Sequence, residues 1–467
     1  MSMAQKRIHI SGATVEDLGS EGKSITRYDN KVIFSEFTAP GDVVDLEIYR
    51  SKKGYAEAKV TAFHTYSPER ATPHCKHFGV CGGCKLQHLR YDRQLYYKEK
   101  QVVDALVRIG KLTIPAVNPI LGSAIQIGYR NKLDFSVSNK RWFTEQEIST
   151  SENLLPNAIG FHIPGRFDKV LDIEHCHHQI EPSNAIRMAL KKFMLDNQLS
   201  FFDLWSQEGF LRGITLRNTQ KGDFMLIIQF GEHNQEWITK TCDFLSSSFP
   251  QISSFYYTVN TKKNDSIYDL DLILYKGLEY LEEEMEGLKF RISPKAFYQT
   301  NPSQAYELYK LTRSFAKLKG TETVYDLYTG TGTIANFIAK QAGKVVGIES
   351  VPSAIEDAKL NSSINNIHNT VFYAGDMKDI FTTAFIAENG RPDVVITDPP
   401  RVGMHKDVVD ELLKLEAPRI VYVSCNPATQ ARDLQLLCEK YDIETVQPVD
   451  MFPHTHHVEN IVVLTLR

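Results

Sequence analysis

Three cysteines fall within ten residues of the chain, in the stretch CKHFGVCGGCKLQHL. They are Cys75, Cys81 and Cys84, spaced C-x5-C-x2-C, and Cys176 follows about 90 residues later in DIEHCHHQ. Four thiolates are the ligand set of structural zinc sites and also of [4Fe–4S] clusters. The spacing by itself favours zinc slightly, and nearby histidines offer substitute ligands: His74, His77, His175 and His177. We therefore predict a metal centre held by the four cysteines.

A glycine-rich turn lies in YDLYTGTGTIA, between an apolar run and a helix-like one. Gly330, Gly332 and Ala335 match G-x-G-x-x-A, a loop that lets a cofactor approach the backbone. Glu349 ends the next apolar run, 19 residues after Gly330, where a carboxylate can bind a ribose hydroxyl. Nicotinamide dinucleotides and S-adenosylmethionine both carry such a ribose. The loop alone leaves both open, together with a third interpretation in which the glycines simply end strands.

Acidic residues around this loop favour S-adenosylmethionine. Asp326 precedes the glycines as D-x-x-x-G-x-G, which resembles the first motif of Rossmann-like methyltransferases. Asp376 follows a third apolar run, at a position that often holds adenine in those enzymes. A fourth run ends in DPPR, Asp398 to Arg401, which resembles the fourth motif of methyltransferases that act on nucleic acid. Together these residues predict a methyltransferase rather than a nicotinamide oxidoreductase.

A solitary cysteine, Cys425, follows the apolar run RIVYVS and stands two residues before a proline. A lone cysteine is commonly a buried, inert core residue. Its position at a strand end, facing the same crevice as Asp398, favours a nucleophile instead. Glu459, in the turn HTHHVEN, is a candidate general base for the same crevice. Zinc ligation by the histidines of that turn is a weaker interpretation, because their spacing is strand-like and no cysteine adjoins them.

The elements that must position these residues change in character along the chain. Residues 1–65 contain short β-branched runs separated by turn residues, which predicts a small barrel. Residues 92–115 have helical periodicity and a basic face, and residues 120–290 mix strands with a helix that begins near Pro182 and Ser183. The acidic stretch EYLEEEMEGL within them is expected to be a solvated turn. From residue 322 onward, short apolar runs alternate with helical stretches, which predicts a parallel, doubly wound sheet.

Composition restricts the class of protein only loosely. The 467 residues are 42% hydrophobic and 24% charged, with a formal net charge of −4, so no global basic excess announces a nucleic-acid partner. A local basic groove would suffice for such a partner. The first residues have no apolar region of a signal peptide, and no run is long enough to span a membrane. We therefore expect a cytoplasmic protein that has no membrane partner and whose cysteines stay reduced.

The motifs in combination resemble one family. DPPR, then SCNP around Cys425, then the closing H-x-x-x-x-E-N pattern, with FYQTN from Phe297 to Asn301, are similar to the RNA uracil-5-methyltransferases. The resemblance covers essentially the whole chain and is strongest to the RumA-type branch, which acts on 23S ribosomal RNA. It implies a multidomain α/β protein in three parts. These are an N-terminal OB-like β-barrel (TRAM) at 1–66, a central α+β domain with the cysteine cluster at 67–288, and a C-terminal Rossmann-like methyltransferase domain at 289–467. The helix near 92–115 is expected to pack on the last of these.

The resemblance also implies a mechanism and its residues. Cys425 would add to C6 of uracil and make C5 nucleophilic; S-adenosylmethionine would supply the methyl group; Glu459 would then remove the C5 proton. The implied cofactor-binding residues are Gln299, Tyr328, Thr333, Glu349, Asp376 and Asp398. For the four cysteines, the family spacing implies a [4Fe–4S] cluster rather than zinc. No step of this chemistry moves an electron, so we expect the cluster to have a structural and RNA-positioning role, with redox sensing as the alternative.

The implied partner is RNA, most specifically 23S rRNA, that presents its uridine flipped out of the stack. We expect a monomer. The same chemistry on tRNA is an alternative, although the tRNA branch typically lacks both the TRAM domain and the cluster. A non-catalytic iron–sulfur RNA-binding factor and a nicotinamide oxidoreductase with an iron–sulfur centre are further alternatives from other functional classes.

Overall fold

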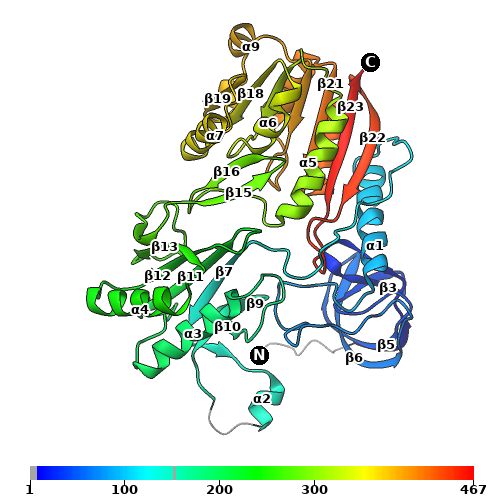
Figure 1. Ribbon diagram of the computed structural model, residues 1–467. Coiled ribbons are helices and arrows are strands. Elements are labelled where there is room, and N and C mark those ends of the chain that lie inside the picture. Colours follow the sequence, from blue (N-terminus) through cyan, green and yellow to red (C-terminus); the bar gives the residue numbers. More distant parts are fainter. Residues whose placement is uncertain (1–7, 151–153) are drawn as a thin grey trace.

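The computed structural model describes residues 8–150 and 154–467. Figure 1 shows three large β-sheets, each formed by a successive part of the chain; we refer to them, with their helices, as the N-terminal, central and C-terminal layers. Residues 1–7 of the expected N-terminal domain lie outside the described residues. The expected domain boundaries, 66/67 and 288/289, remain predictions. None of the helices in the described ranges has the length and apolar character needed to cross a bilayer.

The N-terminal layer is a six-stranded sheet of order β1-β5-β6-β4-β3-β2. Its strands are β1 (Ile8–Thr14), β2 (Asp17–Leu18), β3 (Ser24–Tyr28), β4 (Lys31–Ser35), β5 (Val43–Ser51) and β6 (Tyr55–Thr65), with a helical turn at Ser20–Gly22. Apolar residues alternate along the strands, and Ile10, Val44, Leu46 and Ala56 meet in one buried cluster. β1 also contacts β3, which is not its hydrogen-bonded neighbour, so the sheet curls around this core (Figure 1).

The central layer is an eight-stranded, mostly antiparallel sheet of order β14-β13-β12-β11-β7-β9-β10-β8. Its strands are β7 (Lys132–Ser138), β8 (Arg141–Trp142), β9 (Ala158–Ile163), β10 (Arg166–Asp172), β11 (Leu211–Asn218), β12 (Phe224–Phe230), β13 (Ile252–Val259) and β14 (Ile273–Gly277). Two helices, α3 (Ser183–Asp196) and α4 (Gln235–Ser248), cover one face and bury Leu190 and Leu245 against Phe135 and Ile228. The predicted helix beginning at Pro182–Ser183 is confirmed as α3. A short helix, α2 (Glu145–Thr150), follows β8.

The acidic stretch EYLEEEMEGL is not a solvated turn, so that expectation is wrong. It forms β15 (Leu281–Met285), which pairs with β16 (Leu288–Ile292) as an antiparallel hairpin. The alternation of residue types decides this outcome, because Leu281, Glu283 and Met285 all point inward. Burial raises the pKa of Glu283 to about 7, while the Gln220 N–H donates to its carboxyl at 2.9 Å.

The C-terminal layer is a seven-stranded sheet of order β19-β18-β17-β20-β21-β23-β22, which confirms the predicted doubly wound sheet. Its parallel strands are β17 (Thr323–Leu327), β18 (Lys344–Glu349), β19 (Thr370–Ala374), β20 (Val394–Thr397) and β21 (Arg419–Ser424). The last two strands are β22 (Tyr441–Val449) and β23 (Glu459–Leu466), and β23 runs antiparallel to both of its neighbours.

Helices cover both faces of this sheet, which explains why its strands are continuously apolar. One face packs on α5 (Pro302–Ala316), α6 (Thr333–Ile338) and α7 (Pro352–Ile364), with a helical turn at Ala339–Gln341 after α6. The other face packs on α8 (Met377–Ile380), α9 (Thr383–Asn389), α10 (Lys406–Leu415) and α11 (Pro427–Leu437).

The helix that lies between the first two sheets in the sequence packs on the C-terminal sheet, on the face that α8 to α11 also cover. α1 (Tyr91–Asp104) continues into one wider, π-helical turn, Ala105–Ile109, and buries Val102 and Leu106 in the core of the C-terminal sheet. The helical structure therefore ends before Gly110, short of the expected residue 115.

A buried ion pair fixes α1 to the loop between β22 and β23. The Lys98 ammonium donates to Asp450 at 2.6 Å and to the Phe452 carbonyl at 3.0 Å, and both charged side chains are almost fully buried. The Tyr91 hydroxyl donates to the second oxygen of Asp450 at 2.8 Å. Because a buried carboxylate is tolerated only when its oxygens are paired, these donors fix the start of the loop that leads to Glu459.

Candidate functional site

The predicted catalytic residues and most of the predicted cofactor-binding residues lie at one edge of the C-terminal sheet. Parallel strands β17, β18, β20 and β21 all end there, and the antiparallel strand β23 begins there. In the register of β21 and β23, Ser424 lies opposite Asn460. Cys425 follows the first of these residues and Glu459 precedes the second, so the pairing places thiol and carboxyl at adjoining strand ends.

The glycine loop connects β17 to α6 through left-handed backbone. Tyr328, Gly330 and Gly332 have φ values of 63°, 55° and 71°. A Cβ on Gly332 would lie 2.8 Å from the Cβ of Ala358, so a side chain here would clash as well as strain the turn. The buried Asp326 carboxyl accepts hydrogen bonds from the Ala335 N–H at 3.1 Å and from the Thr329 hydroxyl. These bonds tie the strand end to the helix start, so Asp326 shapes the loop.

Glu349 stands beside the loop at the end of β18. Its carboxylate accepts hydrogen bonds from the Gly330 N–H at 3.2 Å and from the Val351 N–H at 3.0 Å. The backbone thus orients a half-exposed acceptor next to the glycines, where a ribose hydroxyl would find it.

Two further predicted residues, Tyr328 and Asp376, line one cavity of about 640 Å³ with Met377, Met404 and Leu436. Asp376 is exposed and caps α8, accepting from the Lys378 N–H at 3.2 Å. Thr333 is buried, and its hydroxyl lies 3.2 Å from that of Thr331.

Gln299 lies on the side of the site that faces the central layer. Its carbonyl accepts from Asn131 Nδ2 at 3.2 Å, which links the start of β7 to the FYQTN segment. Within the described residues, no hydrogen bond or ion pair joins the Gln299 side chain to the glycine loop, so its place in a cofactor site stays a prediction.

A cluster of acids surrounds the candidate nucleophile. Burial and, after it, the carboxyls of Glu459 and Asp398 together raise the pKa of the Cys425 thiol to about 12, against the opposing effect of Arg401. Burial likewise raises the pKa of Glu459 and of Asp398, and repulsion between nearby carboxylates adds to both shifts. Groups whose environments shift their proton affinities this strongly are typical of catalytic sites.

Two residues near this cluster, Tyr309 and Asp433, are not recognisable as site residues from the sequence. Tyr309 of α5 is buried. Burial raises the pKa of its hydroxyl, and Tyr298 and the carboxyls of Asp398, Asp326 and Glu459 add to this shift. In the sequence, Tyr309 is indistinguishable from an ordinary core residue of an amphipathic helix. Asp433 of α11 is also buried and accepts from the Tyr422 hydroxyl at 2.7 Å and from the Met404 N–H at 2.9 Å. These bonds position the loop after DPPR.

The four clustered cysteines form a separate group between the first and second layers. Each thiol is half-buried. Burial and, after it, the neighbouring thiols Cys75 and Cys176 raise the pKa of Cys81 to about 11 and that of Cys84 to about 12, so the four sulfurs lie near one another. The Cys84 sulfur is 2.8 Å from Nε2 of His178. Over residues 8–150 and 154–467, however, no three His, Cys, Asp or Glu side chains are arranged as a ready metal site.

The cysteine group contacts the loop that precedes Glu459. The His454 carbonyl accepts from the backbone N–H groups of Lys85 and Leu86 at 3.0 and 2.9 Å, and its ring packs edge-on against His74. The two predicted sites are therefore joined by one short segment.

The doubly wound sheet, the glycine loop and the acidic strand ends define a Rossmann-like methyltransferase. Two family profiles match the chain: "tRNA (Uracil-5-)-methyltransferase" over residues 272–467 and "TRAM domain" over residues 12–61. A protein of Bacteroides thetaiotaomicron described as an uncharacterized RNA methyltransferase is 56% identical over 454 residues, covering 96% of this chain and 100% of that protein. An uncharacterized RNA methyltransferase of Chlorobaculum tepidum is 38% identical, covering 92% of this chain and 90% of its own.

A solved structure agrees over almost the full length. The tRNA (uracil-54, C5)-methyltransferase of Pyrococcus abyssi, in complex with S-adenosyl-L-homocysteine, superposes with a TM-score of 0.74 at 29% identity, covering 97% of this chain and 99% of its own. The chain belongs to the family of RNA uracil-5-methyltransferases, which use S-adenosylmethionine as the methyl donor. The predicted family, the N-terminal TRAM domain and the methyltransferase fold are thus confirmed.

The raised pKa of Glu459 predicts a pH-dependent cost in stability. Above the ordinary pKa of a glutamate, the unfolded chain releases this proton while the folded protein retains it, so rising pH favours unfolding until it passes the raised value. Glu459→Gln removes this cost. We expect the variant to gain about 1–3 kcal/mol over the wild type between about pH 5 and pH 8, since each pKa unit is worth about 1.4 kcal/mol. Urea titrations followed by circular dichroism at each pH measure this difference.

The matched control is Glu388→Gln, which changes an exposed glutamate of α9 in the same domain. Its difference from the wild type should stay flat across the same pH range. A flat profile for Glu459→Gln as well would mean that the Glu459 carboxyl is not buried among other acids.

Proposed function

We propose that this enzyme methylates C5 of a uridine in 23S rRNA, with Cys425 as nucleophile and Glu459 as general base. The observation that carries the proposal is the pairing of β21 with β23, which places these two side chains at adjoining strand ends beside Asp398. A cytoplasmic monomer that acts on a flipped-out uridine is part of the same proposal.

The residue types suit the chemistry of C5 methylation. C5 of uracil is a poor nucleophile. A neighbouring carboxylate takes the proton of the Cys425 thiol, and addition of the sulfur to C6 then turns C5 into an enolate-like carbon. S-adenosylmethionine, when bound, supplies the methyl group from its sulfonium. Glu459 then takes the proton from C5, the electron pair reforms the C5–C6 double bond, and the sulfur leaves C6. The sulfur recovers its proton from the carboxyl that took it, and the C5 proton passes from Glu459 to solvent. The products are 5-methyluridine, S-adenosylhomocysteine and one proton.

The electrostatics of the free protein fit this order of events. With a raised pKa, Cys425 is a thiol until its proton is taken, and Glu459 and Asp398 are the carboxyls close enough to affect it. A thiolate in the free enzyme would react with other electrophiles, so a protonated Cys425 avoids side reactions before the RNA binds. A sulfonium cation beside Asp398 would favour the ionised carboxylates that accept protons.

For the cofactor we propose the crevice beyond β17, β18, β19 and β20. Glu349 would hold the ribose, and Tyr328 and Asp376 would flank the adenine in the 640 Å³ cavity that they line. Gln299, Thr333 and Asp398 complete the proposed set. The S-adenosyl-L-homocysteine complex of the Pyrococcus abyssi enzyme supports a cofactor site of this kind.

The choice of RNA has two candidates. The four cysteines together with the TRAM domain favour 23S rRNA, the target of the branch that this chain resembles. The Pyrococcus abyssi structure favours tRNA, because a tRNA enzyme superposes on 97% of this chain and therefore on most of its N-terminal layer. We propose rRNA as the principal substrate and tRNA as the second.

For Cys75, Cys81, Cys84 and Cys176 we propose a [4Fe–4S] cluster, with zinc as the alternative. Four half-buried thiols that lie near one another are a suitable donor set, because metal binding displaces their protons. Small side-chain movements would have to bring the sulfurs together. Such a centre would hold the cysteine segment against the central layer and against His454, which suits a structural role.

The function is tested with RNA from a strain that lacks this gene. Wild-type protein and S-adenosylmethionine should introduce 5-methyluridine, and nucleoside mapping of the separated rRNA and tRNA shows which RNA is modified. Cys425→Ala should lose at least about a thousandfold in rate, because C5 is then not activated. Cys438→Ala, which changes a half-buried cysteine beyond α11, is the control and should remain active. Normal turnover by Cys425→Ala would refute the mechanism.

The metal centre is tested by element analysis of protein purified without oxygen. We expect a brown protein with broad visible absorption and about four irons per chain. Cys81→Ser should lose the colour and most of the iron, whereas Cys438→Ser should keep both. One zinc per chain and no colour would contradict the cluster and support the alternative.

A further inference from the structure

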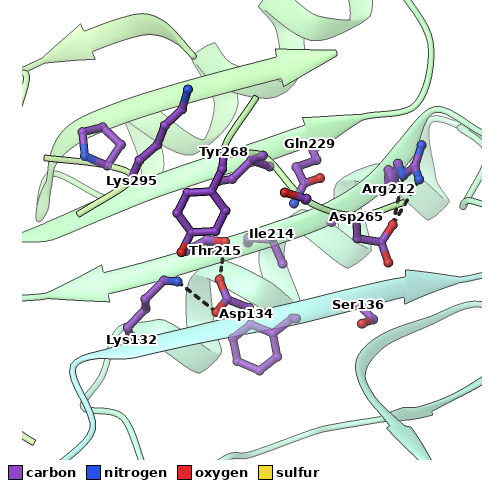
Figure 2. A pocket seen from close by; sticks show the side chains of 15 residues that line it. Lys132, Asp134, Ser136, Arg212, Ile214, Thr215, Gln229, Asp265, Tyr268 and Lys295 are labelled. Carbon is purple, nitrogen blue, oxygen red and sulfur yellow. Dashed lines mark hydrogen bonds and ion pairs between the residues drawn. The ribbon is translucent and has the colours of Figure 1, made fainter. Parts of the chain in front are cut away.

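The polar face of the central sheet contains a cavity of about 230 Å³ that lies outside the methyl-transfer site. Residues 132, 134 and 136 of β7 and 213 and 215 of β11 share this face, because alternate residues of a strand point the same way. The opposite face packs on α3 and α4. Figure 2 shows the cavity between these strands and the segment that carries Asp265 and Tyr268.

The cavity extends down to the β-sheet at Gly213, because a glycine has no side chain to fill this space. Gly213 lies opposite Ser136 on β7 and Gln229 on β12. A Cβ at this glycine would lie 3.3 Å from Gln229 Nε2, so the amide of Gln229 borders the space that the missing side chain leaves. The Gln229 Oε1 already accepts from Asn260 Nδ2 at 3.2 Å. Its Nε2 is thus the donor that remains for a ligand.

The walls are charged. Asp134 lies 3.1 Å from the Lys132 ammonium and accepts from the Thr215 hydroxyl at 2.6 Å, and these partners leave acceptor capacity on its carboxylate. On the other side, Arg212 is buried and bonds the carbonyls of Asn260 and Lys262 as well as Asp265. These bonds occupy the Arg212 guanidinium, so Arg212 stabilises the loop that contains Asn260 and Asp265 and is not free to bind a ligand.

An exposed ring covers the cavity. Tyr268 lines it while 67% of its surface is open to solvent, and Figure 2 shows the ring above Thr215 and Asp134. Lys295 lines the cavity from the opposite segment, but its ammonium points away from Asp134 and donates to the Leu270 carbonyl at 2.6 Å. The aromatic ring of Tyr268, the Asp134 carboxylate, the Gln229 amide and Lys132 therefore line one small space.

We propose that this cavity binds a second nucleotide of the RNA substrate, one near the methylated uridine in the strand. The proposal rests on the proposed function. The base stacks on Tyr268, its amino group donates to Asp134, its neighbouring acceptor receives a hydrogen bond from Gln229 Nε2, and Lys132 faces its phosphate. A base with an exocyclic amino group, adenine, cytosine or guanine, satisfies this pattern.

The size and position of the cavity support this ligand. At about 230 Å³ it is smaller than the roughly 300–1,000 Å³ of pockets for drug-sized ligands, so it suits one ring system rather than a whole cofactor. Lys132 follows Asn131, whose N–H donates to the Thr300 carbonyl at 2.7 Å. The cavity is thus adjacent to the FYQTN segment, and a single strand can reach both sites. Stacking on aromatic side chains is a usual mode of single-stranded RNA recognition.

The experiment compares methylation kinetics on RNA from the deletion strain. Tyr268→Ala and Gly213→Val should raise the KM for RNA about tenfold, while kcat at saturating RNA and the affinity for S-adenosylmethionine stay within about twofold. Tyr268→Phe should restore the KM, because it keeps the ring. Trp205→Ala is the control: Trp205 is 64% exposed, lies in the same sheet domain and does not line the cavity.

An unchanged KM in Tyr268→Ala would overturn the proposal, and this variant alters a surface side chain, so folding does not obscure the result. Tight binding of AMP, CMP or GMP by the wild type, with no competition from RNA, would also overturn it in favour of a free-nucleotide site. If the wild type makes no 5-methyluridine, the proposed function fails, and the cavity is then judged by ultraviolet crosslinking. An RNA crosslink to the peptide that carries Tyr268 supports the subsite, and its absence refutes it.

Discussion

The proposed chemistry depends on one pairing, the antiparallel insertion of β23 between β21 and β22. In an all-parallel sheet, residues at the start of a strand lie at the edge away from the ligand crevice. Because β23 runs the other way, its first residue, Glu459, lies at the edge where β21 ends, next to Cys425, the residue that follows β21. Ser424 opposite Asn460 fixes this register, and a slip by one residue would turn Glu459 to the other face.

Holding several acids at this edge has a cost, and the surrounding structure offsets it. Asp326, Asp398 and Glu459 all have a raised pKa because they are buried near one another. The loop that leads to Glu459 is fixed by the Lys98–Asp450 pair from α1 and by backbone hydrogen bonds from Lys85 and Leu86 to His454. The cysteine segment, the connecting helix and the edge that carries Cys425 and Glu459 thus form one connected unit.

Much of this arrangement is predictable from the sequence, because its signals are local. The glycine loop, the strand-end acids and Cys425 follow apolar runs that can only be strands, and such ends meet at one edge of a parallel sheet. The hairpin β15–β16 is predicted wrongly because three consecutive glutamates suggest solvent, whereas the strand alternation buries Glu283. Tyr309, Asp433 and the cavity below Tyr268 are missed for another reason. Their roles depend on which helix face or sheet face meets which partner, and residue spacing alone does not contain that information.

The central claim is that Cys425 forms a covalent bond to C6 of a uracil whose C5 is then methylated. RNA prepared with 5-fluorouridine tests it most directly, because fluorine at C5 cannot be removed as a proton and the elimination step stops. The account predicts a stable, S-adenosylmethionine-dependent protein–RNA adduct, with the modified and methylated nucleotide on the peptide that contains Cys425. A protein that methylates ordinary RNA but forms no such adduct, or forms it at another cysteine, would contradict the account.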